Sequence, residues 1–116
     1  MNEETRFDPI RYTYHRVALV SELPDGERLF VEIQDEHIVL FNIGGEYAAI
    51  RDVCTHDDGP LGEGDLDGCE IVCPRHGARF NVRSGKALSL PAVEDVPAYP
   101  VRVVGDTIEL GMPEAQ

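Results

Sequence analysis

The sequence predicts an all-β protein, a small antiparallel β-sandwich or partly open barrel, on three observations. Short runs of β-branched and aromatic residues recur along the chain. Clusters of Gly, Asp and Pro that are typical of turns separate these runs. No stretch offers ten residues of helical periodicity. Because 116 residues suit one modest hydrophobic core, we expect a single domain spanning residues 1–116.

Each expected strand is bounded by turn material, which favours antiparallel hairpins. Residues 1–14 are expected to form an N-terminal arm or a sheet edge. The expected strands then cover residues 16–20, 28–33, 37–43, 47–53, 70–73, 78–82, 99–104 and 107–110. We expect residues 54–77, which include the short strand 70–73, to be carried as a pair of loops at one end of the sandwich.

This loop segment concentrates potential metal ligands. One residue separates Cys54 from His56, two residues separate Cys73 from His76, and 16 residues, 57–72, lie between the two halves. In each half a thiolate and an imidazole are close enough in sequence to reach one inorganic centre. The surrounding glycines allow backbone amides to approach that centre.

The mixed composition of each half discriminates between metals. Two Cys and two His could hold a tetrahedral zinc, but zinc sites usually pair like ligands at C-x2-4-C and H-x3-5-H spacing. A mixed half fits a dinuclear iron–sulfur cluster, in which one iron takes a cysteine from each half and the other iron takes a histidine from each half. We therefore favour the cluster and keep zinc as an alternative.

The motifs "CTH" and "CPRHGARF" resemble the Rieske 2Fe-2S signature, C-x-H followed by C-x2-H. The segments "SGKAL" and "VPAYPVRV" resemble the remainder of a small Rieske ferredoxin. The resemblance implies the β-sandwich of Rieske iron–sulfur proteins, with a cluster-binding subdomain of loops at residues 51–84. It further implies one 2Fe-2S cluster per chain, with Cys54 and Cys73 on the buried iron and His56 and His76 on the outer, more solvent-facing iron.

The sequence departs from the Rieske proteins of cytochrome bc complexes, which resemble it but join their cluster loops by a disulfide. Arg75 stands between Cys73 and His76, and Cys69 has no evident partner, so we expect Cys69 to be a small strand residue. Ala78 and Phe80 occupy the places of the serine and tyrosine that donate hydrogen bonds in those proteins. Since such donors stabilise the reduced cluster, we expect a potential at the negative end of the Rieske range of roughly −150 to +300 mV.

Composition restricts the partners and the location. The formal net charge of −12 argues against nucleic acid and favours a basic protein partner. The apolar runs are far shorter than the roughly 20 residues needed to cross a bilayer, and no secretory signal is visible. We therefore expect a cytoplasmic protein without a membrane anchor. The acidic residues Asp57, Asp58 and Glu63 are expected to form a docking face near the cluster. The charges of Asp57 and Asp58 are also expected to lower its potential further.

These residues predict a soluble one-electron carrier and not an enzyme. A mononuclear oxygenase iron would need further ligands, and only His15 and His37 remain after the four motif residues are assigned. The resemblance implies that an NAD(P)H-dependent reductase supplies the electron and that a terminal oxygenase receives it. Two alternatives stay open: a small Rieske subunit of an assimilatory nitrite reductase, and a zinc-stabilised or cluster-free interaction module.

Overall fold

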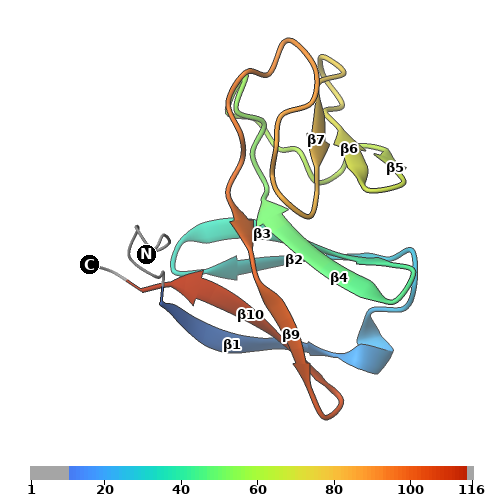
Figure 1. Ribbon diagram of the computed structural model, residues 1–116, viewed down its shortest axis with the longest axis vertical. Coiled ribbons are helices and arrows are strands. Elements are labelled where there is room, and N and C mark those ends of the chain that lie inside the picture. The colour runs from blue at the N-terminus through green and yellow to red at the C-terminus, as the bar shows by residue number, and fades with distance from the viewer. Residues whose placement is uncertain (1–10, 115–116) are drawn as a thin grey trace, which may run out of the picture.

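The computed structural model describes residues 11–114, and these form three antiparallel sheets with the strand orders β1-β10-β9, β2-β3-β4-β8 and β5-β6-β7 (Figure 1). In chain order the elements are β1 (Tyr12–Leu19), the 3-10 helix η1 (Val20–Glu22), β2 (Arg28–Ile33), β3 (Glu36–Ile43), β4 (Glu46–Arg51), β5 (Leu66–Asp67), β6 (Glu70–Val72), β7 (Arg79–Asn81), β8 (Ala98–Tyr99), β9 (Val101–Val104) and β10 (Thr107–Pro113). The all-β prediction is confirmed. Within this range no helix is long and apolar enough to cross a membrane.

Strands β3 and β4 are buried on both faces and connect two hydrophobic cores. Leu40 packs with Leu110 of β10 in one cluster of buried residues, which we call the lower core. Its neighbour Phe41 packs with Phe80 of β7 in a second cluster, which we call the upper core. Alternate side chains of a strand point to opposite faces. The continuous apolar run of β3 is therefore explained by a protein layer on each side of the sheet.

Several strand boundaries differ from those expected, and β5 lies in a segment that was expected to be a loop; the differences at β1 and at Pro100 have a clear physical reason. The first strand begins at Tyr12, because its backbone pairs with β10 from Tyr12↔Pro113 to Leu19↔Thr107, and it ends where the 3-10 helix begins. It is an edge strand of its sheet, while residues 1–10 of the expected arm lie outside the described residues. The expected strand 99–104 is interrupted at Pro100, which has no N–H to donate. There the chain passes from β8 in one sheet to β9 in another.

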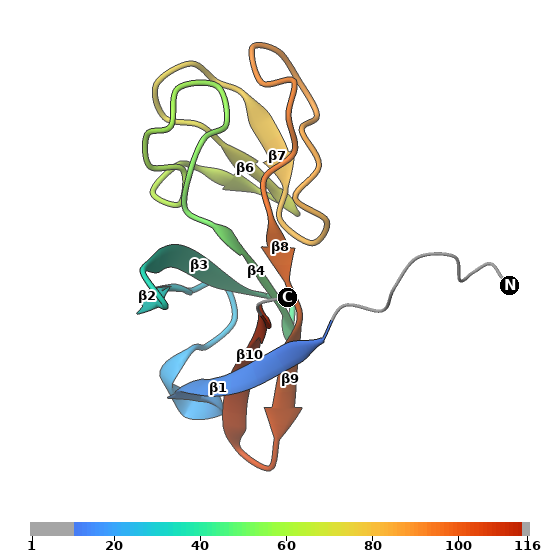
Figure 2. The same cartoon turned by 90° about the vertical axis from the view of Figure 1, so that its left-hand side faces the viewer.

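The third sheet, β5-β6-β7, lies with its loops at one end of the molecule (Figures 1 and 2). We call the other two sheets and the turns that join them the base of the molecule. Two residues of the base, Asp52 and Arg28, bind the segment that leads into the third sheet. The Asp52 carboxylate accepts the N–H groups of Leu61 at 2.8 Å and Gly62 at 2.6 Å. Arg28 of β2 donates to the carbonyl oxygens of Gly62 and Gly64, the latter at 2.8 Å. The loop is thus attached to the base by hydrogen bonds to four backbone groups.

A long segment between β7 and β8 packs on the same end of the molecule. The Val96 N–H donates to the Gly85 carbonyl at 2.8 Å, and the Thr55 hydroxyl donates to the Glu94 carbonyl at 2.6 Å. Ala92 and Val96 are buried in the upper core. In contrast, Leu90 of this segment is 77% exposed. The segment therefore covers the cysteine-containing loops while presenting apolar side chains to solvent.

Candidate metal centre

The two sequence halves meet with their thiols inside and their imidazoles outside. Cys54 and Cys73 are 0% and 1% exposed, and their sulfur atoms lie within 4.8 Å of each other and of a carboxylate oxygen of Asp57. His56 and His76 are exposed, and their ring centroids are 5.0 Å apart at an interplanar angle of 87°. The structure thus pairs cysteine with cysteine and histidine with histidine, although each half of the sequence contains one of each.

Backbone hydrogen bonds within the first loop orient its ligand candidates. The Cys54 N–H donates to the Gly59 carbonyl at 2.7 Å, and the Asp58 N–H donates to the Cys54 carbonyl at 2.7 Å. Asp58 has a φ of 62°, in the left-handed region that asparagine and aspartate tolerate better than most residues. The loop therefore turns back within five residues after Cys54.

The second loop is built in the same way. The Cys73 N–H donates to the Ala78 carbonyl at 2.7 Å, and the Gly77 N–H donates to the Cys73 carbonyl at 2.9 Å. Gly77 has a φ of 75° at the position that Asp58 takes in the first loop, so a residue tolerant of the left-handed region is needed there. Both cysteines thus begin a loop with the same pair of backbone hydrogen bonds.

Burial disfavours the charged form of the Cys54 thiol. Desolvation raises the pKa of Cys54, and hydrogen bonding and repulsion between its sulfur and that of Cys73 act in the same direction. Backbone N–H groups of His56 and Asp57 that point at the Cys54 sulfur oppose this effect. A bound metal ion displaces the thiol proton. The backbone donors are then already in place for a charged sulfur.

Asp57 is not the free negative charge that the sequence suggested. Its carboxylate accepts two hydrogen bonds from the Arg75 guanidinium, at 2.6 and 2.9 Å, which hold its pKa well below the usual range. Sequence reasoning assigned Arg75 no definite partner, since the two residues are 18 positions apart. The opposite charges of Asp57 and Arg75, one in each ligand-bearing loop, were the only feature of the sequence that could have suggested this ion pair.

The remaining candidates are placed as follows. Ala78 and Phe80 are fully buried and carry no hydroxyl, as the sequence requires. Cys69 lies in the turn between β5 and β6, so its assignment to a strand was wrong. It is half-buried against the upper core, and all three cysteines are free thiols. His15 and His37 lie on β1 and β3 in different sheets.

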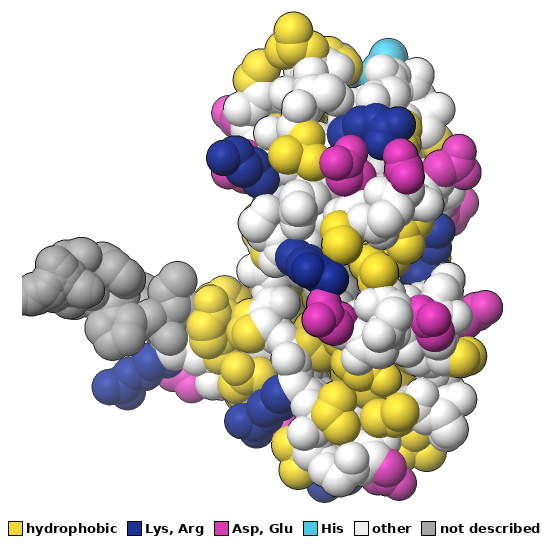
Figure 3. Space-filling view, turned by 45° about the vertical axis from the view of Figure 1, so that its right-hand side comes forward, with side chains coloured by type: hydrophobic (Ala, Val, Ile, Leu, Met, Phe, Trp, Pro, Cys, Tyr) yellow, Lys and Arg dark blue, Asp and Glu magenta, His cyan; other side chains and the backbone are white. Residues whose placement is uncertain are grey.

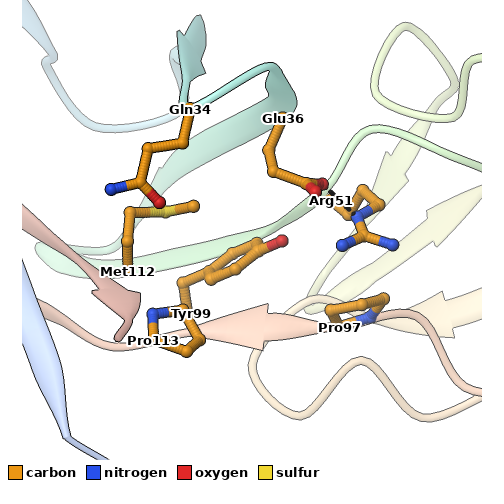
Figure 4. Close-up of a pocket in the computed structure, with 7 residues that line it drawn as sticks. All are labelled: Gln34, Glu36, Arg51, Pro97, Tyr99, Met112 and Pro113. Atoms are coloured by element: carbon orange, nitrogen blue, oxygen red, sulfur yellow. Dashed lines mark ion pairs between the residues drawn. The ribbon is translucent and has the colours of Figure 1, made fainter. Parts of the chain in front are cut away.

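A separate pocket of about 240 Å³ lies among the strands (Figure 4). Glu36 of β3 and Arg51 of β4 form an ion pair of 2.7 Å beside it. Tyr99 of β8 is 7% exposed, and its hydroxyl has no hydrogen-bond partner among the described residues. Burial raises the pKa of Tyr99. This pocket contains no cysteine or histidine and is distinct from the thiol–imidazole group.

The donor set fits an iron–sulfur cluster. Two buried sulfur donors can bind an inner iron, and two exposed nitrogen donors can bind an outer one, which is the ligand division of a Rieske centre. A single tetrahedral zinc would require all four donors around one ion. The backbone N–H groups near Cys54 supply the hydrogen bonds that such sulfur ligands receive.

Comparisons with known proteins agree with this chemistry. A family model described as the Rieske [2Fe-2S] domain matches residues 13–100. The 3-phenylpropionate/cinnamic acid dioxygenase ferredoxin subunit of Escherichia coli (strain K12) is 44% identical over 98 residues, which are 84% of this chain and 92% of that one. The ferredoxin of carbazole 1,9a-dioxygenase from Nocardioides aromaticivorans IC177 superposes with a TM-score of 0.79 at 33% identity, over 84% of this chain and 96% of that one.

A second structural likeness is to a chain in a complex of reduced oxygenase and oxidized ferredoxin in carbazole 1,9a-dioxygenase. It has a TM-score of 0.80 and 28% identity, over 89% of this chain and 97% of the other. Both structural relatives are thus matched along nearly their whole length. The fold, the paired thiol and imidazole loops and the matched family model lead to one conclusion: this chain belongs to the Rieske [2Fe-2S] domain family.

Proposed function

We propose that this protein is a one-electron carrier that holds a Rieske 2Fe-2S cluster through Cys54, Cys73, His56 and His76. The cysteines would bind the inner iron and the histidines the outer iron. The observation that carries the proposal is the meeting of two buried thiols with two exposed imidazoles from separate loops. The cluster-binding part would comprise residues 51–84 together with the covering segment 85–97.

The partners follow from the relatives. The matched proteins are ferredoxin components of dioxygenases of aromatic compounds. An NAD(P)H-dependent reductase would therefore reduce this protein, and a terminal oxygenase acting on an aromatic substrate would oxidise it. The cluster, when bound, takes up and releases a single electron. A cytoplasmic location fits both the free thiols and a reductase that uses NAD(P)H.

The chain's own residues would keep the centre dry on one side and accessible on the other. Cys54 and Cys73 are enclosed by the upper core, which excludes water from the inner part of the site. His56 and His76 reach the surface, so their rings provide the shortest way between the centre and a docked partner. A rigid β-scaffold limits rearrangement on reduction and so lowers the barrier to electron transfer.

The docking surface would surround the exposed imidazoles. Hydrophobic side chains and a histidine are visible together at this end of the molecule (Figure 3). Leu90 and Val93 are 77% and 78% exposed, and Asp58 and Glu63 are exposed acidic residues of the first loop. Asp57, which the sequence placed in the same acidic set, is paired with Arg75 instead. A partner with an apolar patch flanked by basic residues fits this surface.

We further propose a potential at the negative end of the Rieske range. The support is the absence of a hydroxyl donor at the buried positions Ala78 and Phe80. Hydrogen bonds to sulfur ligands stabilise the reduced state, so their loss lowers the potential. A low potential suits an acceptor of electrons from NAD(P)H-linked reductases.

The test is a potentiometric titration of the purified protein followed by electron paramagnetic resonance, with iron and sulfide analysis. We expect about two irons and two sulfides per chain, as a 2Fe-2S cluster requires, and a rhombic signal of mixed nitrogen and sulfur ligation in the reduced protein. His56→Ala and His76→Ala should each abolish that signal. The matched control His37→Ala, at an exposed histidine on β3, should leave it unchanged.

Two results would contradict the proposal. A colourless protein with one zinc per chain would favour the interaction module, and a cluster that survives replacement of either histidine would exclude imidazole ligation. The nitrite reductase alternative has a separate test. A subunit of that enzyme would remain with a large partner through washing with salt, whereas a transient ferredoxin is released as salt screens its acidic surface.

A further inference from the structure

An ion pair connects the two ligand-bearing loops directly. Asp57 follows His56 in the first loop, and Arg75 precedes His76 in the second. The Arg75 Nε donates to Asp57 Oδ2 at 2.6 Å, and its Nη2 donates to Asp57 Oδ1 at 2.9 Å. Its remaining terminal nitrogen, Nη1, donates to the Pro60 carbonyl at 2.7 Å. All three nitrogen atoms of one side chain therefore bind the opposite loop.

The first loop is shaped to receive this guanidinium. A Cβ atom on Gly59 would lie 2.7 Å from the Arg75 Cζ, so a larger residue there would displace the guanidinium from this position. The Gly59 N–H also donates to Asp57 Oδ1 at 3.0 Å, and its carbonyl accepts the Cys54 N–H. The contact is thus joined to the backbone bond that orients Cys54.

The same pair reaches the other ligand candidates. Asp57 Oδ2 lies 3.5 Å from Nε2 of His76. The hydrogen bonds to Asp57 are the main reason that the pKa of Arg75 is raised, and nearby thiolate charges on Cys73 and Cys54 act in the same direction. A positive charge at this place favours the more negative, reduced form of a bound cluster.

We propose that the Arg75–Asp57 pair is the non-covalent cross-link of the two cluster loops, and that Arg75 is a positioning residue whose charge also raises the reduction potential. The inference rests on the proposed function. In the bc-type proteins a disulfide joins the loops, whereas the three cysteines here are free. A bidentate arginine–carboxylate pair is the strongest side-chain link available without a second pair of cysteines.

The two roles can be separated because they respond differently to two neutralising substitutions. Arg75→Gln and Asp57→Asn both remove the cross-link, so both should accelerate loss of the cluster. Their charges change in opposite directions. Arg75→Gln removes a positive charge and should lower the potential, whereas Asp57→Asn removes a negative charge and should raise it.

The experiment uses the cluster-loaded protein and two readouts. The rate of cluster loss to an iron chelator is followed by visible absorbance, and the potential is measured by spectroelectrochemistry. Outer ligand contacts in metal sites are typically worth about 10- to 100-fold in affinity, and we expect a comparable acceleration of cluster loss in each single variant. The double variant should lose its cluster no faster than the single variant that loses it faster, because the cross-link can be removed only once.

Two further variants complete the design. Arg75→Lys keeps the charge but not the planar fork, so it should accelerate cluster loss while leaving the potential near that of the wild type. If Arg75→Gln fails to retain a cluster, Asp57→Asn still tests the charge effect, because its potential should rise, and an unchanged or lower potential would overturn it. Arg102→Gln is the charge-matched control, since Arg102 pairs with Glu109 at 2.8 Å on β9 and β10 in the base. It should leave both readouts unchanged.

Each part of the proposal can be overturned by a different result. Cluster loss within twofold of the wild type in Arg75→Gln and Asp57→Asn would overturn the cross-link. Shifts of the potential in the same direction in both variants would overturn the charge effect. A wild-type protein that contains no 2Fe-2S cluster would instead refute the proposed function, and that result is visible before any variant is made.

Discussion

Replacing Asp52 with alanine tests whether the base of the sandwich holds the first cluster loop. The carboxylate of Asp52 accepts the N–H groups of Leu61 and Gly62, both of which are buried. In Asp52→Ala these two buried donors lose their partner. A hydrogen bond to a charged group contributes about 1.5–3 kcal/mol, and the two bonds share one acceptor atom, so we expect a loss of about 2–4 kcal/mol in the free energy of unfolding.

The assay is urea denaturation of the loaded protein followed by far-ultraviolet circular dichroism. At an m-value of about 2 kcal/mol/M, the expected loss lowers the midpoint by roughly 1–2 M. Asp25→Ala is the matched control, because Asp25 accepts a single exposed N–H, that of Gly44, at 2.6 Å. Its removal should cost about 0.5–1 kcal/mol. Asp52→Asn keeps the size of the side chain and an acceptor oxygen, so it should fall between the two.

Equal effects of Asp52→Ala and Asp25→Ala would refute the reasoning, since Asp52 accepts two buried donors and Asp25 accepts one exposed donor. A second readout separates a local from a global effect. Because the loop that begins after Cys54 is attached through Leu61 and Gly62, Asp52→Ala should also accelerate cluster loss to a chelator. Asp25→Ala should not.

Three other predictions concern the potential, the pocket and the docking surface. Ala78→Ser adds a hydroxyl close to Cys73 in sequence. If that hydroxyl donates a hydrogen bond to the reduced centre, the potential should rise by at most roughly 65–130 mV, which is equivalent to about 1.5–3 kcal/mol. A lower potential would contradict this prediction. Tyr99→Phe removes a buried hydroxyl without a partner, so unfolding free energy at pH 7 should stay equal or rise by up to about 1 kcal/mol. Because the pKa of Tyr99 is raised from 10.0, the folded state retains its proton longer, and wild-type stability should fall above pH 10 more steeply than that of the variant in urea titrations. The double variant Leu90→Ser/Val93→Ser changes two exposed side chains, so the free energy of unfolding should change by less than about 0.5 kcal/mol. Reduction of the terminal oxygenase by this variant, measured by stopped flow, should be slower than by the wild type. An unchanged rate would place the docking surface elsewhere.

The ligand candidates and most of the strands could be predicted from the amino-acid sequence, because both depend on residues that are close together in the chain. Cys54 and His56, or Cys73 and His76, are close in the chain whatever the fold, and their mixed pairing pointed to a dinuclear centre. Hairpin strands were equally accessible, since turn residues and β-branched runs are local signals. The break at Pro100 was missed because both sides of the proline have strand composition, and only the sheet partners distinguish β8 from β9.

The polar residues that support the site could be identified only from the folded structure. The sequence suggested that Asp57 is an unpaired negative charge and gave Arg75 no definite partner. The two side chains in fact bind each other, although they are 18 positions apart in the chain. The attachment of Gly62 by Arg28 and Asp52 likewise joins the first loop to strands of the base. Such contacts depend on how the sheets pack, and any of the chain's 22 acidic residues could have met a given arginine. The pattern that selects the metal is local, whereas the contacts that hold its loops together arise only when the distant segments fold against each other.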